Sequence, residues 1–489
     1  MSTQLWQARW HAMMAQVFLL AQRNSALVPT LVKRRLRGIL SRAVTVDVTS
    51  VEDWSRPLVP GSDAPSVVWP APTYNVASET GMDPKRRVRG ETEIRCLLAT
   101  ESLDAGGMDE VVAFLARGLP QFGLRVAVLH TPTNSSSALG RLGRVLSAEG
   151  VEVVDLDRGN CATWIRKWRP DVISVHGAPD WVLEAASECS VPTIETLHGM
   201  HNQFNAAPSE VASRRELLTG LVCVSEMVRQ QYLAIDDHCD PDSVVTIPNG
   251  VLAQRQQTIP RSHARSLMGL GDEYLFVSLS RHCVQKNTYG LASAFSRVAD
   301  VVPEAHLLIC GRPDDTAYAG QVARLKGKMR HGDRLHLRDH TPHPGVLLSA
   351  ADGFVLDSFF EGWALSSMEA LIAGLPVIVS EVGGAREQLA GRPEWGLLVS
   401  NPLGNALEVD WDAMSSARFQ RQSNHEELVA AMVSFSRDPA WDLSRRSFAL
   451  DAAERFDGVL CLRRHATVLK AAAAKEPIAV TGNSGMADK

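Results

Sequence analysis

Residues 353–380 read GFVLDSFFEGWALSSMEALIAGLPVIVS, and this stretch decides the fold. The apolar run 353–356 predicts a buried strand, and the spacing of apolar residues over 366–373 predicts a helix. A glycine and a proline follow the helix, and they indicate its end and the start of a second apolar strand over 377–380. The stretch therefore predicts a strand–helix–strand unit of an open α/β sheet.

Two glutamates stand eight positions apart in this unit. Glu361 falls in the loop at the carboxyl end of the first strand, and Glu369 falls about one turn into the helix. Ligands of open parallel sheets bind at that edge. Two carboxylates there suit a ligand with many hydroxyl groups, because each carboxylate accepts two or more hydrogen bonds. The backbone amides of Trp363 to Leu365, at the start of the helix, suit an anion such as phosphate.

The stretch resembles the retaining glycosyltransferases of the GT-B fold, and within them glycosyltransferase family 4. The resemblance rests on the frame EGxxLxxxEAxxxGxPVIxSxxGGxxE, which this chain continues to Gly383, Gly384 and Glu387. Two glutamates at this spacing are by themselves common on solvated helices, so the surrounding frame carries the resemblance. It covers about residues 93–470. It implies an enzyme that moves a sugar from a nucleoside diphosphate to an acceptor.

Composition agrees with a large α/β protein. The 489 residues leave room for two large domains and an extension, and the net charge of −5 argues against a nucleic-acid binder. The eight cysteines include no Cys-x2-Cys pair. We therefore expect reduced thiols in a cytoplasmic protein and no zinc site. The sequence shows no signal peptide and no apolar run of about 18 residues, so we expect no membrane span.

From residue 94 onward, apolar runs alternate with helical stretches, which is typical of doubly wound parallel sheets. The first set of expected strands is 94–99, 124–130, 151–156, 172–176, 193–197 and 221–224. The second set is 276–279, 306–309, 334–337, 353–356, 377–380 and 396–399. We therefore expect an α/β protein of the GT-B fold, with two Rossmann-like domains facing a cleft.

The expected domain boundaries follow from the same pattern and from the resemblance. They are an N-terminal extension and linker over 1–90, an acceptor domain over 91–252, a nucleotide-sugar donor domain over 253–452, a helix over 453–475 that crosses back to the first domain, and a disordered tail over 476–489. The resemblance places the donor on the second domain and the acceptor on the first.

The resemblance also marks three residues outside the glutamate frame. Arg281 and Lys286 follow a strand of the second half, where the family clamps the diphosphate of the donor. Cations suit that place because the leaving group gains negative charge as the glycosidic bond breaks. His198 follows a strand of the first half, where a family histidine faces the donor sugar. His201 is a less favoured neighbour for that role.

Gly106 and Gly107 follow the first strand and open a helix. Paired glycines let the backbone approach a phosphate or a sugar closely, although an ordinary turn would use them as well. The resemblance favours the ligand. The expected donor-binding residues are Gly106, Gly107, Arg281, Lys286, Glu361, Gly362, Trp363, Ala364, Leu365 and Glu369. The expected catalytic residues are His198, Arg281, Lys286 and Glu361.

We expect no metal and no cofactor. Asp155-Leu156-Asp157 and Asp240-Pro241-Asp242 are Asp-x-Asp triplets, which bind a divalent ion in the other main glycosyltransferase fold. Their places at a strand end and in a loop are ordinary for aspartate, so Arg281 and Lys286 are expected to act in place of the ion. A dinucleotide fingerprint is absent, which argues against a nicotinamide enzyme. The donor is expected to be a UDP- or GDP-sugar, bound as substrate.

Three functions remain open from the sequence. The favoured one is a retaining transferase that uses front-face displacement, in which the leaving phosphate helps to deprotonate the acceptor hydroxyl of a glycan, a lipid-linked sugar or a small molecule. A sugar-nucleotide epimerase or a phosphorylase of the same fold is the second. A non-catalytic scaffold is the third, and the complete set of Arg281, Lys286, Glu361 and Glu369 argues against it.

The first ninety residues differ from the rest of the chain. They hold 12 Lys and Arg against 6 Asp and Glu, a balance of +6, while the remainder has −11. Trp6, Trp10 and the basic residues 33–37 are consistent with a peripheral contact at the inner face of a membrane. The alternative is a helical cap packed against the first domain. Residues 55–90 are rich in proline, glycine and serine, which indicates a linker.

Overall fold

The computed structural model describes residues 51, 52, 54, 57–59, 93–104, 106–131, 139–201, 203, 204, 206–251, 259–444 and 447–478, without the side chains of 442–444. The expectations for Trp6, Trp10, the basic residues 33–37 and the tail beyond 478 lie outside these residues.

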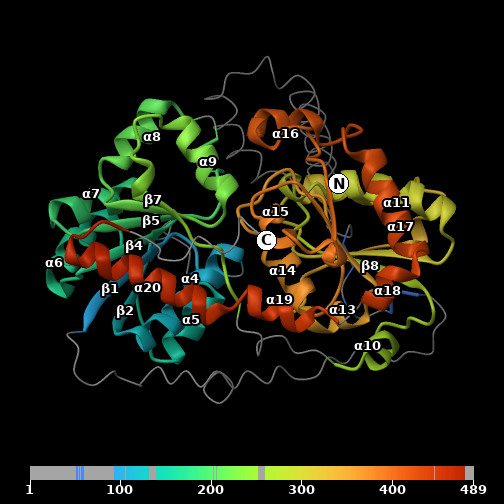
Figure 1. Ribbon diagram of the computed structural model, residues 1–489, viewed down its shortest axis with the longest axis horizontal. Coiled ribbons are helices and arrows are strands. Elements are labelled where there is room, and N and C mark those ends of the chain that lie inside the picture. Colours follow the sequence, from blue (N-terminus) through green and yellow to red (C-terminus); the bar gives the residue numbers. More distant parts are fainter. Residues whose placement is uncertain are drawn as a thin grey trace, which may run out of the picture.

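Two domains, each built around a parallel sheet, lie side by side in Figure 1. The first sheet has the strand order β3-β2-β1-β4-β5-β6-β7. Its strands are β1 (Ile94–Thr100), β2 (Leu124–His130), β3 (Glu152–Asp155), β4 (Val172–His176), β5 (Thr193–Leu197), β6 (Gly220–Cys223) and β7 (Val244–Thr246). Its helices are α4 (Gly107–Gly118), α5 (Arg141–Ala148), α6 (Arg158–Trp168), α7 (Asp180–Glu188), α8 (Pro208–Arg215) and α9 (Glu226–Ile235).

The second sheet has the order β10-β9-β8-β11-β12-β13. Its strands are β8 (Tyr274–Leu279), β9 (Ala305–Cys310), β10 (Leu335–Arg338), β11 (Gly353–Leu356), β12 (Val377–Ser380) and β13 (Gly396–Val399). Its helices are α10 (Arg261–Leu267), α11 (Thr288–Val301), α12 (Thr316–Lys326), α13 (Pro344–Ala350), α14 (Leu365–Ile372), α15 (Ala385–Leu389), α16 (Trp411–Ala417), α17 (His425–Arg437), α18 (Pro439–Ser444) and α19 (Ala449–Arg455).

The predicted fold class and all twelve predicted strands are confirmed, with ends shifted by at most two residues. The central strands β4, β5 and β12 are buried along their whole length, because helices cover both faces of each sheet. Strand β7 was not predicted. Its three residues are too few to show a pattern, and its pairing with β6 defines it.

The last helix, α20 (Gly458–Ala474), crosses from the second domain onto the first. Asp457 caps it by accepting a hydrogen bond from the Val459 amide at 2.8 Å. Leu462, on the buried face of α20, packs against Gly118, where an added Cβ would stand 2.4 Å from Leu462 Cδ1. The helix therefore completes the core of a domain whose other elements lie more than 200 positions earlier.

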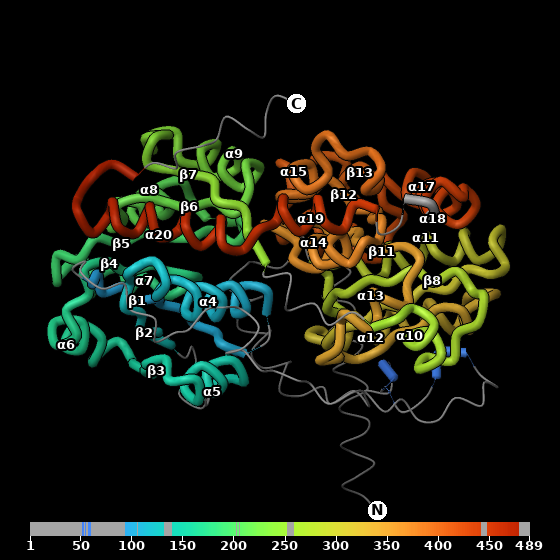
Figure 2. The backbone as a smooth tube through the Cα atoms, turned by 60° about the horizontal axis from the view of Figure 1, so that its bottom comes forward, coloured from blue at the N-terminus to red at the C-terminus, as the bar shows by residue number. Residues whose placement is uncertain are grey.

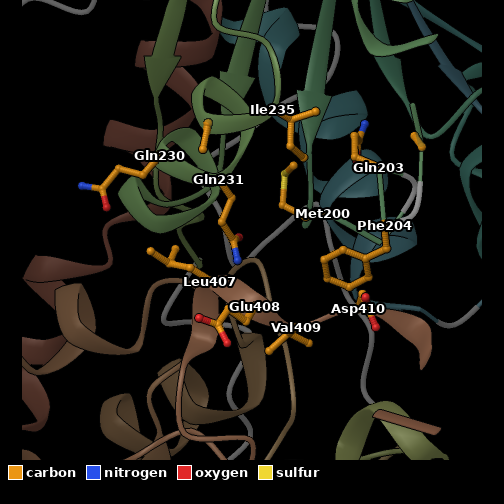
Figure 3. A pocket seen from close by; sticks show the side chains of 12 residues that line it. Met200, Gln203, Phe204, Gln230, Gln231, Ile235, Leu407, Glu408, Val409 and Asp410 are labelled. Atoms are coloured by element: carbon orange, nitrogen blue, oxygen red, sulfur yellow. The ribbon is translucent and has the colours of Figure 1, made fainter. Parts of the chain in front are cut away.

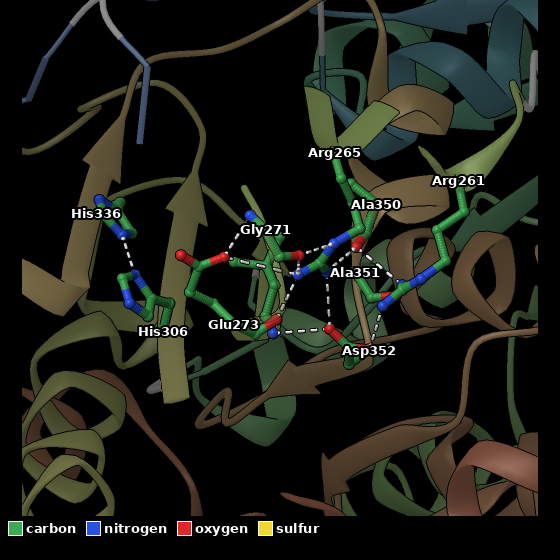
Figure 4. Close-up of polar contacts among 10 residues, drawn as sticks. Arg261, Arg265, Gly271, Glu273, His306, His336, Ala350, Ala351 and Asp352 are labelled. Atoms are coloured by element: carbon green, nitrogen blue, oxygen red, sulfur yellow. Dashed lines mark hydrogen bonds and ion pairs between the residues drawn. The ribbon is translucent and has the colours of Figure 1, made fainter. Parts of the chain in front are cut away.

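Buried ionic contacts fix α10 to the base of the second sheet (Figure 4). Arg261 and Arg265 donate to the two carboxylate oxygens of Asp352 at 2.6 and 3.1 Å. Asp352 also accepts the Leu275 amide at 2.8 Å, and so joins α10 to the first residues of β8 and β11. Complete pairing of this kind offsets the cost of burying the charges.

A segment from the N-terminal extension pairs with the edge strand of the second domain. The Glu52 amide donates to the Leu337 carbonyl at 3.0 Å, and the Glu52 carbonyl accepts the Asp339 amide at 3.1 Å. The Trp54 indole donates to the Asp339 carbonyl at 2.9 Å. Figure 2 shows the short blue pieces of this segment beside α12 and α10. The segment thus covers an edge of the sheet that would otherwise present unpaired backbone groups.

The prediction that 55–90 is a linker is therefore wrong at its beginning. Leu58 is 3% exposed and lies in a buried apolar cluster that joins residues of both domains, and its amide donates to the Met268 carbonyl at 2.9 Å. Arg338 donates to the Pro57 carbonyl at 3.1 Å. The proline-rich composition suggested a linker because these contacts involve the backbone and single apolar side chains, which leave no periodic pattern. Within the described part of the chain, no helix combines the length and apolar character needed to cross a bilayer.

Candidate active site

Glu361 lies in the loop that follows β11, where it is 9% exposed. Its Oε1 accepts hydrogen bonds from Lys286 Nζ at 2.5 Å and from the Ser358 hydroxyl at 2.6 Å. Lys286 comes from the loop after β8, the strand next to β11 in the sheet. The sheet order thus brings together two residues predicted separately from the sequence. The second carboxylate oxygen of Glu361 makes no hydrogen bond with the described residues.

The β8 loop also presents Arg281. Its guanidinium forms an ion pair with Asp314, in the loop after β9, at 2.7 Å and donates to Gln285 Oε1 at 3.0 Å. Gln285 in turn donates to the Phe360 carbonyl at 3.3 Å. The side chain of Arg281 remains 42% exposed, so its charge is open to a ligand. Arg281, Lys286 and Glu361 therefore form one connected polar surface.

A buried aspartate holds this surface in place. Asp357, at the end of β11, accepts amide hydrogen bonds from Asn287 at 2.8 Å and Asn424 at 2.7 Å. Burial raises the pKa of Asp357 to about 7. Asn287 follows Lys286 directly and has a left-handed φ of 46°. Asp357 thus fixes the turn that carries Lys286, and nothing in the sequence pattern marked it.

The first domain approaches Glu361 through the loop after β5. A Cβ at Gly362 would stand 2.1 Å from the His198 carbonyl oxygen, so only glycine allows this approach. A Cβ at Gly384 would stand 2.1 Å from the ring of Trp363. The Trp363 side chain is buried, and only its backbone can serve a ligand. Gly362 and Gly384 are thus required by packing between and within the domains.

Gly106 and Gly107 differ from these glycines. A Cβ on Gly107 would meet only Leu365 Cδ1, at 3.7 Å, and a Cβ on Gly106 would meet Asp109 at 3.4 Å. Gly106 also has an ordinary extended φ of −88°. The fold therefore tolerates a side chain at both positions. The Leu365 contact places this loop opposite the start of α14, the helix that carries Glu369.

Further contacts join the two domains around these loops. Arg312, after β9, forms an ion pair with Asp104, after β1, at 2.9 Å. The Glu226 amide at the start of α9 donates to Glu387 at 2.8 Å, and burial raises the pKa of Glu387 to about 7. These two contacts lie at the carboxyl edges of both sheets, on either side of the Glu361 loop.

His198 is bonded to a second histidine. Its Nε2 lies 2.9 Å from Nδ1 of His176, at the end of β4, and His176 Nε2 lies 3.0 Å from the Ser174 hydroxyl. Burial lowers the pKa of His198 to about 3. It also lowers the pKa of His465, a residue of α20, to about 4. His198 is therefore neutral at neutral pH. The sequence did not single out His176 or His465, because a buried histidine at a strand end or in a helix is an ordinary feature.

His201, the less favoured of the two histidines for the role toward the donor sugar, lies beside Phe360 and near Arg281. Its ring stacks on Phe360, with the ring centres 6.3 Å apart. Burial and the nearby Arg281 cation lower the pKa of His201. Its carbonyl accepts a hydrogen bond from the Trp411 indole at 3.2 Å. His201 thus belongs to the wall of the site beside Phe360.

A cavity of about 370 Å³ lies between the domains next to this wall (Figure 3). It is lined by Met200, Gln203, Phe204, Ala206, Gln230, Gln231, Ala234, Ile235, Leu407, Glu408, Val409 and Asp410. The lining combines amides, carboxylates and apolar groups and includes no cation. Phe204 connects it to the site through an edge contact with Phe360, with ring centres 4.9 Å apart.

The aspartates of the two triplets make contacts with neighbouring residues of the fold. Asp155 pairs with His130 at 2.6 Å, and Asp157 caps α6 by accepting the Asn160 amide. Asp240 accepts the Asp242 amide at 3.0 Å. In the described part of the chain, no group of three or more His, Cys, Asp or Glu residues is arranged to hold a metal ion.

Comparison with known proteins identifies the family of the chain. A family model described as Glycosyltransferase Family 4 matches residues 105–255, and one described as Glycosyl transferases group 1 matches residues 273–409. These matches and the fold define a glycosyltransferase of the GT-B fold. The chain is, more narrowly, a member of the family 4-like, group 1 glycosyltransferases.

Individual relatives are distant. The chain is similar to the D-inositol 3-phosphate glycosyltransferase of Frankia alni, with 25% identity over 74% of this chain and 95% of the relative. It is similar to the glycogen synthase of Mycobacterium tuberculosis, with 27% identity over 45% of this chain and 55% of the relative. Two solved structures share the fold. One is HepE of Anabaena in complex with UDP and glucose, with 16% identity, a TM-score of 0.59, and 77% of this chain and 100% of HepE covered. The other is a glycosyltransferase of Rickettsia africae, with 17% identity, a TM-score of 0.62, and 78% and 99% covered.

Proposed function

We propose that this chain transfers a sugar, with retention, from a nucleoside diphosphate sugar to an acceptor hydroxyl, without a metal ion. The observation that carries the proposal is the surface of Arg281, Lys286 and Glu361, which faces the His198 loop where the domains meet. Two cations and a carboxylate on one surface suit a ligand that is anionic at one end and hydroxylated at the other. A nucleotide sugar has this character.

Each residue has a distinct role in this proposal. Arg281 and Lys286 stabilise the negative charge that grows on the diphosphate as the glycosidic bond breaks. Glu361 accepts hydrogen bonds from sugar hydroxyls, and Glu369 accepts those of the ribose. The backbone amides of Gly362 to Leu365 bind sugar and phosphate oxygens. The leaving phosphate takes the acceptor proton as it departs.

UDP is the favoured nucleotide, because structures that share the fold are described with UDP or UDP-glucose bound. The acceptor is a hydroxyl compound on the first domain. The cavity beside Phe204 has no cation in its lining, so it fits a neutral part of the acceptor better than the diphosphate. The relatives act on unlike acceptors, an inositol phosphate and glycogen among them by their names, so the acceptor class stays open.

We also propose that the basic N-terminal extension brings the enzyme to anionic membranes, where lipid-linked acceptors are found. Each basic residue near such a surface contributes about 1 kcal/mol, which salt screens. Full-length protein should bind vesicles that contain phosphatidylserine at low salt, and a chain lacking residues 1–50 should not. Equal binding by both chains would contradict the proposal.

The decisive experiment is a thermal-shift screen of UDP- and GDP-sugars, followed by a release assay. A bound donor raises the melting temperature by mass action. The stabilising donor is then incubated with candidate acceptors, and free nucleoside diphosphate is measured. Release that depends on an acceptor supports the transferase. Conversion of the sugar without an acceptor indicates an epimerase, release that needs phosphate indicates a phosphorylase, and binding with no turnover for any acceptor indicates a scaffold.

A further inference from the structure

Three polar side chains form a line that ends at the candidate site. The Ser174 hydroxyl lies 3.0 Å from His176 Nε2, and His176 Nδ1 lies 2.9 Å from His198 Nε2. Ser174 is 1% exposed and His176 is fully buried, whereas His198 is partly exposed. Nδ1 of His198 makes no hydrogen bond with any described residue. The line therefore begins in the core and ends at a partly exposed residue, one ring nitrogen of which has no hydrogen-bond partner among the described residues.

Both histidines are neutral. Burial lowers the pKa of each; a charge on His465 lowers both pKa values further, and a charge on His198 lowers that of His176. A neutral imidazole has one N–H donor and one lone-pair acceptor. The proton positions in the two rings are therefore coupled, because two facing nitrogens can share only one hydrogen. Only two arrangements of the hydrogens allow both hydrogen bonds of the line to form.

In the first order, Ser174 donates to His176 Nε2, His176 Nδ1–H donates to His198 Nε2, and His198 carries its proton on Nδ1. In the second order every bond is reversed, and Nδ1 of His198 is an acceptor. The second order leaves the Ser174 hydroxyl hydrogen without an acceptor in the part of the chain that the structure describes. Leaving a buried hydroxyl donor unpaired carries the desolvation cost of that group with no hydrogen bond to offset it. The first order avoids this cost.

We propose that Ser174 and His176 are positioning residues that hold His198 as its Nδ1–H tautomer. His198 then donates a hydrogen bond to an oxygen of the donor sugar or its phosphate. The direction toward the donor rests on the proposed function, whereas the tautomer rests only on the hydrogen-bond line. The buried Nε2 of the neighbouring His465 has no hydrogen-bond partner, so that atom takes no part in the line.

The tautomer can be observed directly in the free protein. Long-range ¹H–¹⁵N NMR of protein labelled in histidine separates Nδ1–H from Nε2–H rings by the shifts of the two nitrogens. A His198→Gln variant assigns the signals. We expect the Nδ1–H form of His198 in the unaltered protein, and the Nε2–H form would overturn the proposal.

The matched variants are Ser174→Ala and Thr196→Val. Thr196 is a buried residue on β5 whose hydroxyl has no hydrogen-bond partner, so its replacement tests hydroxyl loss near His198 without touching the line. Ser174→Ala should turn the His198 signal into that of a mixture of tautomers, and Thr196→Val should leave it unchanged. An unchanged signal in Ser174→Ala would overturn the role of Ser174.

His176 is tested by replacement with Asn, whose side-chain amide can donate where Nδ1–H donates, and with Leu, which cannot. The Nδ1–H form should persist in His176→Asn and be lost in His176→Leu.

With a nucleotide sugar that the enzyme uses, Ser174→Ala should lower kcat roughly 2- to 10-fold and change KM less. This factor corresponds to the loss of one neutral hydrogen bond. If the tautomer shifts and kcat does not, the role toward the donor is overturned and the proton order stands. If no nucleotide sugar binds any variant, the proposed function fails and the NMR result still decides the proton order.

Discussion

Lys286 Nζ lies 2.5 Å from Glu361 Oε1, although the two residues are 75 positions apart in the chain. Their side chains are 16% and 8% exposed, so each charge depends on the other. The pair therefore serves stability as well as the proposed chemistry, and a test of function must separate the two.

Replacing Lys286 with Met should abolish most of the transfer activity and lower the free energy of unfolding by about 3–5 kcal/mol, because Glu361 is left charged and unpaired. The double variant Lys286→Met with Glu361→Gln should regain most of the stability and none of the activity. Chemical denaturation and a release assay give the two readouts. Lys328→Met, at an exposed position, is the control. Full turnover by Lys286→Met would contradict the proposal that the charge of Lys286 stabilises the leaving diphosphate.

Glu369→Ala should weaken binding of the nucleotide sugar by about 1.5–3 kcal/mol, the scale of a hydrogen bond to a charged group. Isothermal titration calorimetry with the donor found by thermal shift measures the change. Glu394→Ala, an exposed glutamate outside the site, should bind as the unaltered protein does. An affinity that is the same in both variants would refute the ribose assignment.

Transfer should continue in excess chelator, because Arg281 and Lys286 supply the positive charge at the diphosphate. Arg281→Ala should reduce turnover strongly with or without added magnesium. The measurement is the initial rate of nucleoside diphosphate release with EDTA and after addition of magnesium. Activity that vanishes in EDTA and returns with magnesium would show that a metal is required.

The stability contributed by His198 and His465 should fall as the pH falls below 6.5, whereas protonation of Asp357 and Glu387, whose pKa values are raised to about 7, acts in the opposite direction. The folded-state pKa values of His198 and His465 are lowered to about 3 and about 4, so the unfolded chain takes up protons that the folded chain excludes. By linkage, the stability that each neutral ring contributes is complete above pH 6.5 and is lost as the pH falls toward these values. Each histidine should contribute about 1–2 kcal/mol of loss between pH 7 and pH 5.

Urea titrations at pH 7 and pH 5 test this dependence. Compared with the unaltered protein, His465→Leu should lose less stability between pH 7 and pH 5, since a leucine takes up no proton in either state. His238→Leu should not, because the His238 side chain is 85% exposed. An equal difference in both variants would contradict the assignment to the buried histidines.

Leu58→Ala should lower the melting temperature by about 4–10 °C, because a buried leucine contributes about 2–5 kcal/mol. Leu58 is tied to the second domain by the hydrogen bond from its amide to the Met268 carbonyl. Leu450→Ala is the matched control, since Leu450 is 78% exposed. Scanning calorimetry separates the domains if they melt apart. An unchanged melting temperature in Leu58→Ala would indicate that residues 57–59 act as a linker and do not stabilise the fold.

The sequence by itself determined the strands, the fold class and the glutamate frame. Apolar runs and glycine or proline stops are local, so strands such as 353–356 and 377–380 could be predicted without knowing their partners. The same local pattern placed Glu361 at a carboxyl edge, and the frame around it indicated the family. Arg281, Lys286 and His198 could be named only through that resemblance, since a single cation or histidine after a strand has no distinctive pattern.

Only the tertiary structure decided which of these residues touch. Lys286 meets Glu361 because β8 and β11 are neighbours in the sheet, and sheet order is not encoded in the spacing along the chain. His176 meets His198 for the same reason, since β4 and β5 pair in parallel and end together. The pairing of Glu52 with β10 was equally invisible, because edge pairing uses backbone groups that every residue carries.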